Sequence, residues 1–184
     1  MKKLVSPLLF VLLVLLPGCS LILYGPVRTY PDDFTGGSRH LLTRVVRPRE
    51  LSTQIGSATM MFEKRVDDYN TKNTIYIVVS RSYGSFRSEE NGYLKVNDTI
   101  FPLPLAYVTI ERDYSVEDSD DKDDSEPTIS GKLNEKFRLE LTPEIVNAIV
   151  TGTSMEFRFY FGPEPATYRL KGSKLASVQR LLNK

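Results

Sequence analysis

The residues of this 184-residue chain that could do chemistry are few, and the densest group of them is acidic. The run EDSDDKDDSE, residues 117–126, holds seven acids and one lysine, which gives a local charge of −6. Asp118, Asp120 and Asp124 offer spaced oxygen ligands of the kind that a hard cation such as Ca²⁺ binds. An EF-hand loop also needs a glycine at its sixth position, and the run has none. A cation site and a solvated loop both stay open, and self-repulsion of the run favours the loop.

Nucleophilic or metal-dependent catalysis has little support in the sequence. The single histidine, His40, would have to serve any Ser-His-Asp triad, and no G-x-S-x-G sequence occurs. One histidine cannot build a His-based metal cluster, and no glycine-rich phosphate-binding motif is present. We expect His40 to be exposed, and we expect no metal or cofactor. Two carboxylates about 5–9 Å apart would suffice for glycoside cleavage, so a carboxylate-dependent hydrolase is kept as an alternative.

A second group of candidate residues is basic. Arg39, Arg44 and Arg47 are close in sequence, and Arg49 follows them. Beside a membrane they would meet anionic headgroups or glycan phosphates, each contributing about 1 kcal/mol at most. The same residues could instead form the solubilising face of a strand. The chain's net charge of +1 provides no dominant positive field, so we expect no nucleic-acid partner.

A third group is aromatic. The polar segment SRSYGSFRSEENGY, residues 80–93, contains Tyr83, Phe86 and Tyr93 near two glycines. Aromatic side chains on such a loop can stack on sugars or contact a partner protein. They could also fold back onto the core as the cap of a hairpin. We therefore take these three aromatics, with Arg39, Arg44 and Arg47, as candidate partner-binding residues.

The only cysteine, Cys19, follows an apolar run near the start of the chain. Two lysines precede the stretch LVSPLLFVLLVLL, residues 4–16. Thirteen helical residues rise about 20 Å, which is short of a hydrocarbon core of ~30 Å. This pattern is typical of the hydrophobic region of a signal peptide.

The sequence Leu16-Pro17-Gly18-Cys19 resembles the lipobox of bacterial lipoproteins. The resemblance implies a diacylglyceryl thioether on Cys19, cleavage before it, and often a third acyl chain on the new N-terminus. Ser20 is not the aspartate that retains lipoproteins of enteric bacteria in the inner membrane, so the implied location is the outer membrane, facing the periplasm. The alternative is an uncleaved helix over residues 4–24 that anchors the chain in the inner membrane. An acylated Cys19 would leave no thiol for a disulfide.

These segments predict the domain organisation. We expect a signal peptide at 1–18, a lipidated tether at 19–38 and a single β-rich globular domain at 39–184. The tether is predicted because residues 20–38 are rich in glycine and proline and show little periodicity. The acidic loop, 117–126, lies inside the globular domain.

Alternation with period two dominates the chain from about residue 41. In MEFRFYF, residues 155–161, apolar side chains alternate with Glu156, Arg158 and Tyr160. TIYIVVSR, residues 74–81, is apolar on both sides and indicates a central strand. The remaining strands are predicted at 59–66, 93–96, 106–113, 136–141 and 166–171, with a tight turn at Asn97-Asp98.

Two short helices complete the prediction. Thr142 caps the first, with Pro143 and Glu144 in its first turn. Ser173 is predicted to cap the second, whose apolar stripe would cover the sheet. The fold class is therefore α+β: a mainly antiparallel sheet, for which a sandwich is one arrangement, with the C-terminal helix packed on it.

The expected function is that of a lipid-anchored envelope lipoprotein. Its domain would be a non-enzymatic binding or structural module, held at the membrane by its lipid and contacting an envelope protein or glycan. This expectation follows from the tethered β-rich domain and the lack of a catalytic motif. The sequence does not indicate the oligomeric state.

Overall fold

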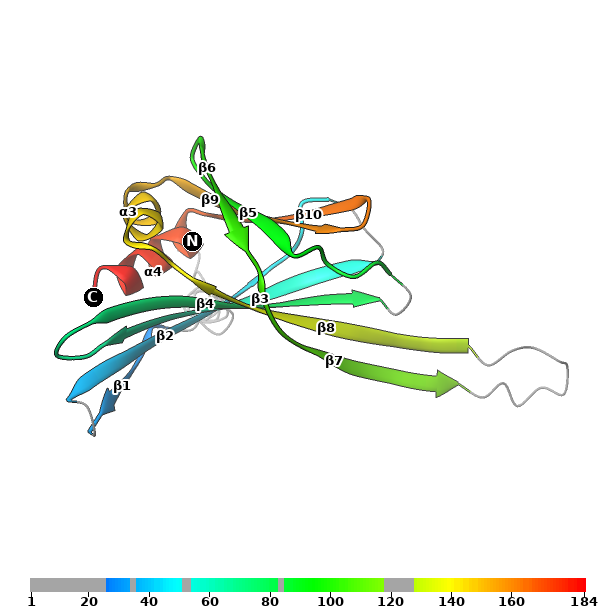
Figure 1. Ribbon diagram of the computed structural model, residues 1–184, viewed down its shortest axis with the longest axis horizontal. Coiled ribbons are helices and arrows are strands. Elements are labelled where there is room, and N and C mark those ends of the chain that lie inside the picture. Colours follow the sequence, from blue (N-terminus) through cyan, green and yellow to red (C-terminus); the bar gives the residue numbers. More distant parts are fainter. Residues whose placement is uncertain (1–25, 34–35, 51–53, 83–84, 118–127) are drawn as a thin grey trace, which may run out of the picture.

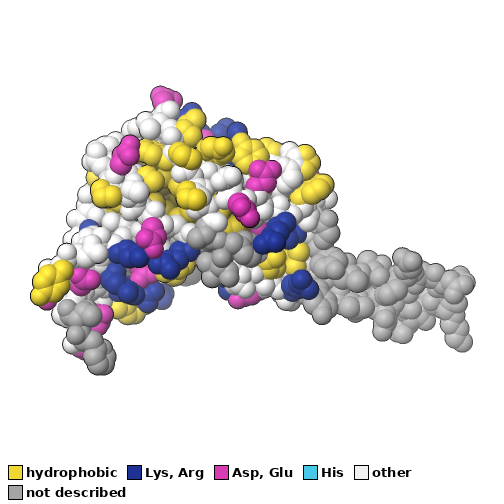
Figure 2. All heavy atoms as spheres, in the orientation of Figure 1, with side chains coloured by type: hydrophobic (Ala, Val, Ile, Leu, Met, Phe, Trp, Pro, Cys, Tyr) yellow, Lys and Arg dark blue, Asp and Glu magenta, His cyan; other side chains and the backbone are white. Residues whose placement is uncertain are grey.

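The computed structural model describes residues 26–33, 36–50, 54–82, 85–117 and 128–184. Two antiparallel sheets face one another, and two helices lie in the same layer as the smaller sheet (Figure 1). On the face seen in Figure 2, the hydrophobic side chains that reach the surface gather over the layer formed by the smaller sheet and the helices, which is uppermost in this view. The predicted fold class is confirmed: a mainly antiparallel β fold with two short helices, the C-terminal one packed on the sheet.

The larger sheet forms one complete layer. It runs in the order β1 (Arg28–Asp32), β2 (Gly37–Val46), β3 (Ile55–Val66), β4 (Thr71–Ser82), β8 (Thr128–Glu140) and β7 (Ala106–Glu117). The central position predicted for TIYIVVSR is confirmed, because β4 lies between β3 and β8. The hairpin of β7 and β8 extends beyond the other strands as an arm (Figure 1).

The smaller sheet carries the strongest alternation of the chain. Its order is β10 (Glu164–Lys171), β9 (Ser154–Phe161), β5 (Asn91–Val96) and β6 (Thr99–Pro104). The predicted tight turn joins β5 to β6: Val96 pairs with Thr99, and Asn97 has a φ of 51°. Asparagine tolerates this left-handed conformation better than most residues, which fits a two-residue hairpin.

Both helices form where the sequence predicts them. In α3 (Pro143–Thr151) the hydroxyl of Thr142 accepts the amide of Ile145 at 3.4 Å, as expected of a cap. In α4 (Ser173–Leu182) the predicted cap is wrong by one residue. Gly172 occupies the capping position with a φ of 56°, and no side chain caps the helix. Glycine is suited to this position because a side chain disfavours positive φ.

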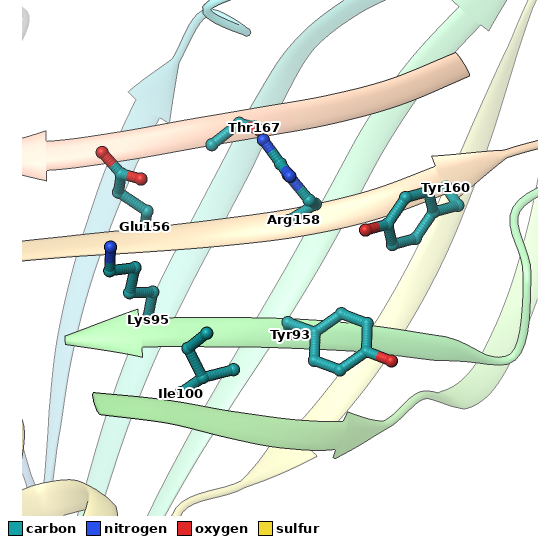
Figure 3. Close-up of a pocket in the computed structure, with 7 residues that line it drawn as sticks. All are labelled: Tyr93, Lys95, Ile100, Glu156, Arg158, Tyr160 and Thr167. Atoms are coloured by element: carbon teal, nitrogen blue, oxygen red, sulfur yellow. The ribbon is translucent and has the colours of Figure 1, made fainter. Parts of the chain in front are cut away.

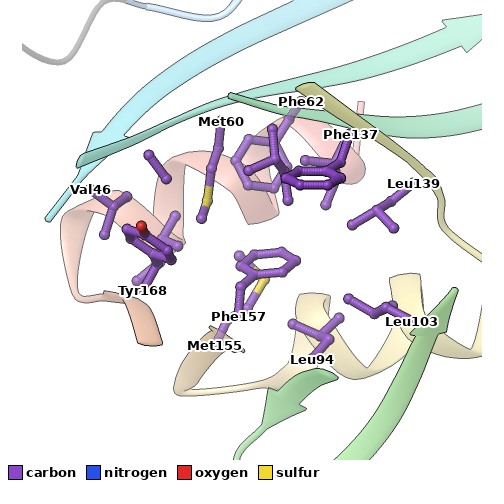
Figure 4. Packing of buried hydrophobic residues seen from close by; sticks show 14 of the residues in the cluster. Val46, Met60, Phe62, Leu94, Leu103, Phe137, Leu139, Met155, Phe157 and Tyr168 are labelled. Carbon is purple, nitrogen blue, oxygen red and sulfur yellow. The ribbon is translucent and has the colours of Figure 1, made fainter. Parts of the chain in front are cut away.

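The core lies between the two layers (Figure 4). Phe157 and Phe159 project from β9, and the Phe159 ring stacks on Phe137 of β8 with centroids 5.7 Å apart. Tyr168 is fully buried beside Phe159 and donates its hydroxyl to Gly56 O at 3.0 Å. Burial and the nearby Glu50 carboxylate raise the pKa of Tyr168 above its usual range, so the ring stays a neutral donor.

The larger sheet begins inside the segment predicted to be a tether. β1 pairs along its whole length with β2, from Arg28 opposite Leu41 to Asp32 opposite Gly37. Ordered structure therefore starts before residue 39. Four of the five residues of β1 are exposed, so hydrophobic periodicity cannot detect this strand.

Candidate functional site

The fold separates the candidate arginines. Neighbours in a strand point to opposite faces, so Arg39 and Arg44 of β2 cannot share a surface. Arg44 is only 3% exposed; its Nε donates to Ser177 Oγ of α4 at 3.0 Å and its Nη1 to Thr43 O at 2.7 Å. The prediction that Arg44 contacts a partner is wrong, because this side chain lies beneath α4.

Arg39 and Arg47 both reach the surface, but they lie far apart. Arg39 is near the start of β2, and Arg47 comes directly after its end. Arg39 is held by Glu63, with its Nε and Nη2 donating to the two carboxylate oxygens at 2.7 and 3.3 Å. Arg47 is exposed. The expected arginine patch does not form.

His40 is buried, so the prediction that it is exposed is wrong. Its Nδ1 lies 2.9 Å from Thr29 Oγ1, and its Nε2 lies 3.0 Å from Ser38 Oγ. Burial lowers the pKa of His40, and the charges of Lys184 and Lys64 lower it further. The neutral imidazole lies between two hydroxyls and links β1 to β2. The side chains around it do not form a catalytic triad.

The aromatic candidates also separate. Tyr83 lies outside the described residues, as do Cys19 and residues 118–126 of the acidic loop. Phe86 is 59% exposed and lies against Gly162 in the turn between β9 and β10. Tyr93 is 38% exposed on the outer face of the smaller sheet, where its ring meets Tyr160 edge to face with centroids 6.2 Å apart.

Tyr93 belongs to a groove on this outer face. The groove has a volume of about 420 Å³, and the close-up shows its side chains rising from all four strands (Figure 3). It is lined by Tyr93 and Lys95 of β5, Ile100 of β6, Glu156, Arg158 and Tyr160 of β9, and Thr167 of β10. The tyrosine pair marks one end of it, and Lys95 and Glu156 mark the other.

The groove continues past Lys95 and Glu156 into a second hollow of about 510 Å³. Asn97, Asp98 and Arg169 are among its lining residues. The two hollows share Lys95 and Glu156, so they lie side by side on the outer face of the sheet.

Neighbouring carboxylates hold the basic side chains of the groove in place. Arg158 Nε donates to Thr167 Oγ1 at 3.0 Å, and its Nη2 lies 3.9 Å from Glu50 Oε1. Glu156 Oε1 lies 3.2 Å from Arg49 Nη1 and 3.1 Å from Arg169 Nε. These ion pairs orient the basic side chains of the groove, and the Arg158 side chain remains about half exposed.

Glu50 stays ionised beside the groove. Partial burial opposes its charge, but hydrogen bonds from the Thr167 side chain and amide and the charge of Arg158 outweigh burial, so the pKa of Glu50 is lowered. A general acid for glycoside cleavage needs a raised pKa. Glu50 therefore has the wrong protonation for that role.

A second polar cluster, between the two layers, is missing from the sequence-based candidates. Arg81 Nε donates to Glu135 Oε1 at 2.5 Å, and both side chains are at most 5% exposed. Glu135 Oε2 accepts the Ser88 hydroxyl at 2.5 Å, and Arg81 Nη1 donates to Ser85 O at 2.9 Å. The pair therefore fixes the segment that connects β4 to β5.

Both sites leave a signal in the sequence. Arg81 and Glu135 occupy the apolar phase of their strands, in line with Val79 and Phe137, which marks them as buried charges. The groove residues of β9 occupy the polar phase of MEFRFYF. The sequence assigns each residue to a face but does not show which polar face is hollowed.

Comparison with known proteins finds no matching family model, no matching curated protein and no matching solved structure. Within the described ranges, no helix has both the length and the apolar character needed to cross a membrane. The same residues contain no group of three or more His, Cys, Asp or Glu side chains that could hold a metal ion.

Proposed function

We propose that this protein is a lipid-anchored lipoprotein of the bacterial outer membrane whose folded domain binds an envelope glycan in the groove of the smaller sheet. The observation that carries the binding role is the groove itself. Tyr93, Ile100 and Tyr160 offer apolar contact beside Arg158 and Lys95, which offer hydrogen bonds and charge.

The shape and chemistry of the groove favour a glycan over a protein partner. A stable protein interface buries roughly 800 Å² on each side around an apolar centre. Here Tyr93 and Ile100 are the large apolar side chains exposed on the described part of this sheet. A sugar chain needs less apolar area, because it uses ring faces together with many polar contacts.

The alternative is a carboxylate-dependent hydrolase acting on an envelope polymer. The carboxylates beside the groove, Glu50 and Glu156, are each engaged by arginine, and Glu50 has a lowered pKa. These contacts suit positioning of a ligand better than donation of a proton.

Calorimetric titration of the full, processed chain in detergent with soluble peptidoglycan glycan fragments tests the binding role. We expect binding without turnover, and Arg158→Ala should weaken it at least about tenfold, or 1.4 kcal/mol. Arg138→Ala is the matched control, because Arg138 is an arginine of similar exposure on the larger sheet. Equal affinity in both variants, or no binding by the wild type, would overturn the glycan role. Turnover of the fragments would favour the hydrolase.

The lipid anchor has its own test. Globomycin treatment, or the substitution Cys19→Ala, should leave an unprocessed precursor without acyl label. Unchanged gel mobility with no acyl label on the wild type would overturn the lipoprotein assignment and favour the uncleaved helix.

A further inference from the structure

The two sheets have four edges, and three of them are protected against pairing with another strand. An unprotected edge presents unpaired N–H and C=O groups to any extended chain that approaches. β1, at one edge of the larger sheet, has only five residues and contains Pro31. Short length and proline are both known ways to block an edge.

β6 is blocked by two prolines that face outward. The amide of Leu105 donates to Glu90 O at 2.9 Å, toward the β5 side, so alternate residues of β6 point the other way. Pro102 and Pro104 are at these alternate positions, and neither has an amide hydrogen to offer.

β10 is covered by the chain that follows β2. Pro48 forms a bridge with Tyr168, and the Arg49 amide donates to Thr167 O at 2.9 Å. The Thr167 amide donates to the carboxylate of Glu50 at 2.7 Å. The hydrogen-bonding groups at the centre of this edge are therefore used within the chain.

β7 differs from the other three edge strands. It is 12 residues long, about 40 Å, and contains no proline. Its register with β8 shifts between Tyr107 and Thr109, and the pairing is regular from Thr109 to Glu117, which is still longer than any other edge strand. Its partner is β8 on one side, and no strand of the described residues pairs with its other side. Glu111 and Arg112, near its midpoint, are exposed. Among the described strands, β7 is thus the long edge that stays open.

We propose that β7 is a self-association edge, which pairs antiparallel with β7 of a second copy about a twofold axis. Such a pair closes on itself, because each copy uses the open edge of its described strands to cover that of the other. The two larger sheets would then join into one continuous sheet. The pairing uses neither the groove nor the lipid anchor, so it does not rest on the proposed function.

Charge favours the antiparallel orientation over the parallel one. The acidic run begins at Glu117, the last residue of β7, and carries a charge of −6. Parallel pairing would start both runs at the same end of the joined strands. Antiparallel pairing starts them at opposite ends, several Debye lengths apart at physiological ionic strength.

A cysteine scan along β7 in the full chain tests this proposal. Single cysteines placed at each position from 106 to 117 are oxidised in intact cells that express the full chain, and disulfide-linked dimers are read on non-reducing gels. Residues that cross the twofold axis face their own copies at about 4.5–5.5 Å, within disulfide reach. We expect one peak of cross-linking that falls away on both sides.

The controls are the wild type, whose only cysteine is Cys19, and Ile100→Cys on the proline-blocked edge. Cross-linking that is absent, uniform along β7, or no stronger than that of Ile100→Cys would overturn the proposal. Uniform cross-linking is the result expected of parallel pairing or random collision.

Proline substitution provides a second measurement. Ile110 and Glu111 are neighbours, so one of the two directs its amide outward and the other toward β8. Each proline is combined with the single cysteine that gives the strongest cross-linking. The proline at the residue whose amide points outward should abolish cross-linking without changing the melting temperature. The proline at the residue whose amide points toward β8 should lower the melting temperature. Retained cross-linking in both proline variants would contradict edge pairing.

Discussion

Two regions of this protein combine arginine with glutamate, and they differ in solvent exposure. Between the layers, Arg81 and Glu135 are 5% and 0% exposed. At the groove, the side chains of Arg158, which lines it, and of Glu50, which lies beside it, are 48% and 32% exposed. The residue types are the same, so their roles must follow from their surroundings.

The comparison shows how burial determines what an ion pair can do. A buried pair must satisfy nearly all its hydrogen bonds within the protein, as Glu135 does with Arg81 and Ser88. It therefore fixes the chain between β4 and β5 and offers nothing to a ligand. The exposed pair contributes little stability but leaves part of Arg158 available for binding.

The largest effect is expected when the buried pair is broken. Glu135→Gln leaves Arg81 without a counter-charge in the interior, which costs about 3–5 kcal/mol. Glu156→Gln, in the groove, should cost about 0–1 kcal/mol, because its arginine partners stay solvated. Urea denaturation of both variants measures the difference.

Replacing both buried charges should recover part of the loss. The double variant Arg81→Leu/Glu135→Leu removes the uncompensated charge, so it should be more stable than Glu135→Gln. Similar free energies of unfolding for Glu135→Gln and Glu156→Gln would show that burial does not separate the two regions.

A smaller effect is expected at the turn against which the loop residue Phe86 packs. Gly162 has a φ of 58°, and a β-carbon there would lie 2.6 Å from Phe86 Cγ. Gly172 has a similar φ of 56° but open space around it. Gly172→Ala should therefore cost about 1–2 kcal/mol from backbone strain alone, and Gly162→Ala about 1 kcal/mol more, because the exposed ring of Phe86 can shift.

Thermal melting compares the two glycine variants. Combining Gly162→Ala with Phe86→Ala should remove the steric part of the loss and leave the backbone part. If Gly162→Ala and Gly172→Ala are equally stable, the ring of Phe86 does not pack on this turn as described.

The smallest effect is a pH dependence confined to acid conditions. The pKa of His40 lies below its usual value of 6.5, so the unfolded chain binds a proton more readily than the folded one. The contribution of His40 to the free energy of unfolding is fully present above pH 6.5. It is lost as the pH drops through the pKa that His40 has in the folded protein. His40→Gln should flatten this part of the curve of unfolding free energy against pH.

Glu50, which is only partly buried, provides the comparison. Its pKa is also lowered, from 4.5, so its contribution is present above pH 4.5 and is lost at lower pH. Glu50→Gln should change the curve only in that lower window. An unchanged slope just below pH 6.5 in His40→Gln would show that His40 is not a buried neutral group.

Much of the fold follows from local pattern. Period two identifies the strands of the smaller sheet, because one face of each packs on the core and the other meets solvent. Thr142 and the Asn97-Asp98 turn act through contacts within a few residues, so their roles are also readable. β1 is not predictable in this way, because its five residues bury too little surface to leave a pattern.

The site was predictable only in part. Tyr93 was identified as a candidate, and Arg158 was assigned to a polar face, but nothing local indicates that they share a hollow with Thr167 of β10. Arg44 shows the converse error: adjacency in sequence suggested a surface cluster, whereas α4, from the end of the chain, covers this residue.

The amino-acid sequence by itself determined the faces of the alternating strands, the helix positions and the resemblance to a lipobox, because each depends on residues within a few positions of one another. Tertiary structure alone decided that α4 covers Arg44, which polar face is grooved and which edge stays open. Those properties depend on contacts between segments as distant as β2 and α4, and no local pattern records such contacts.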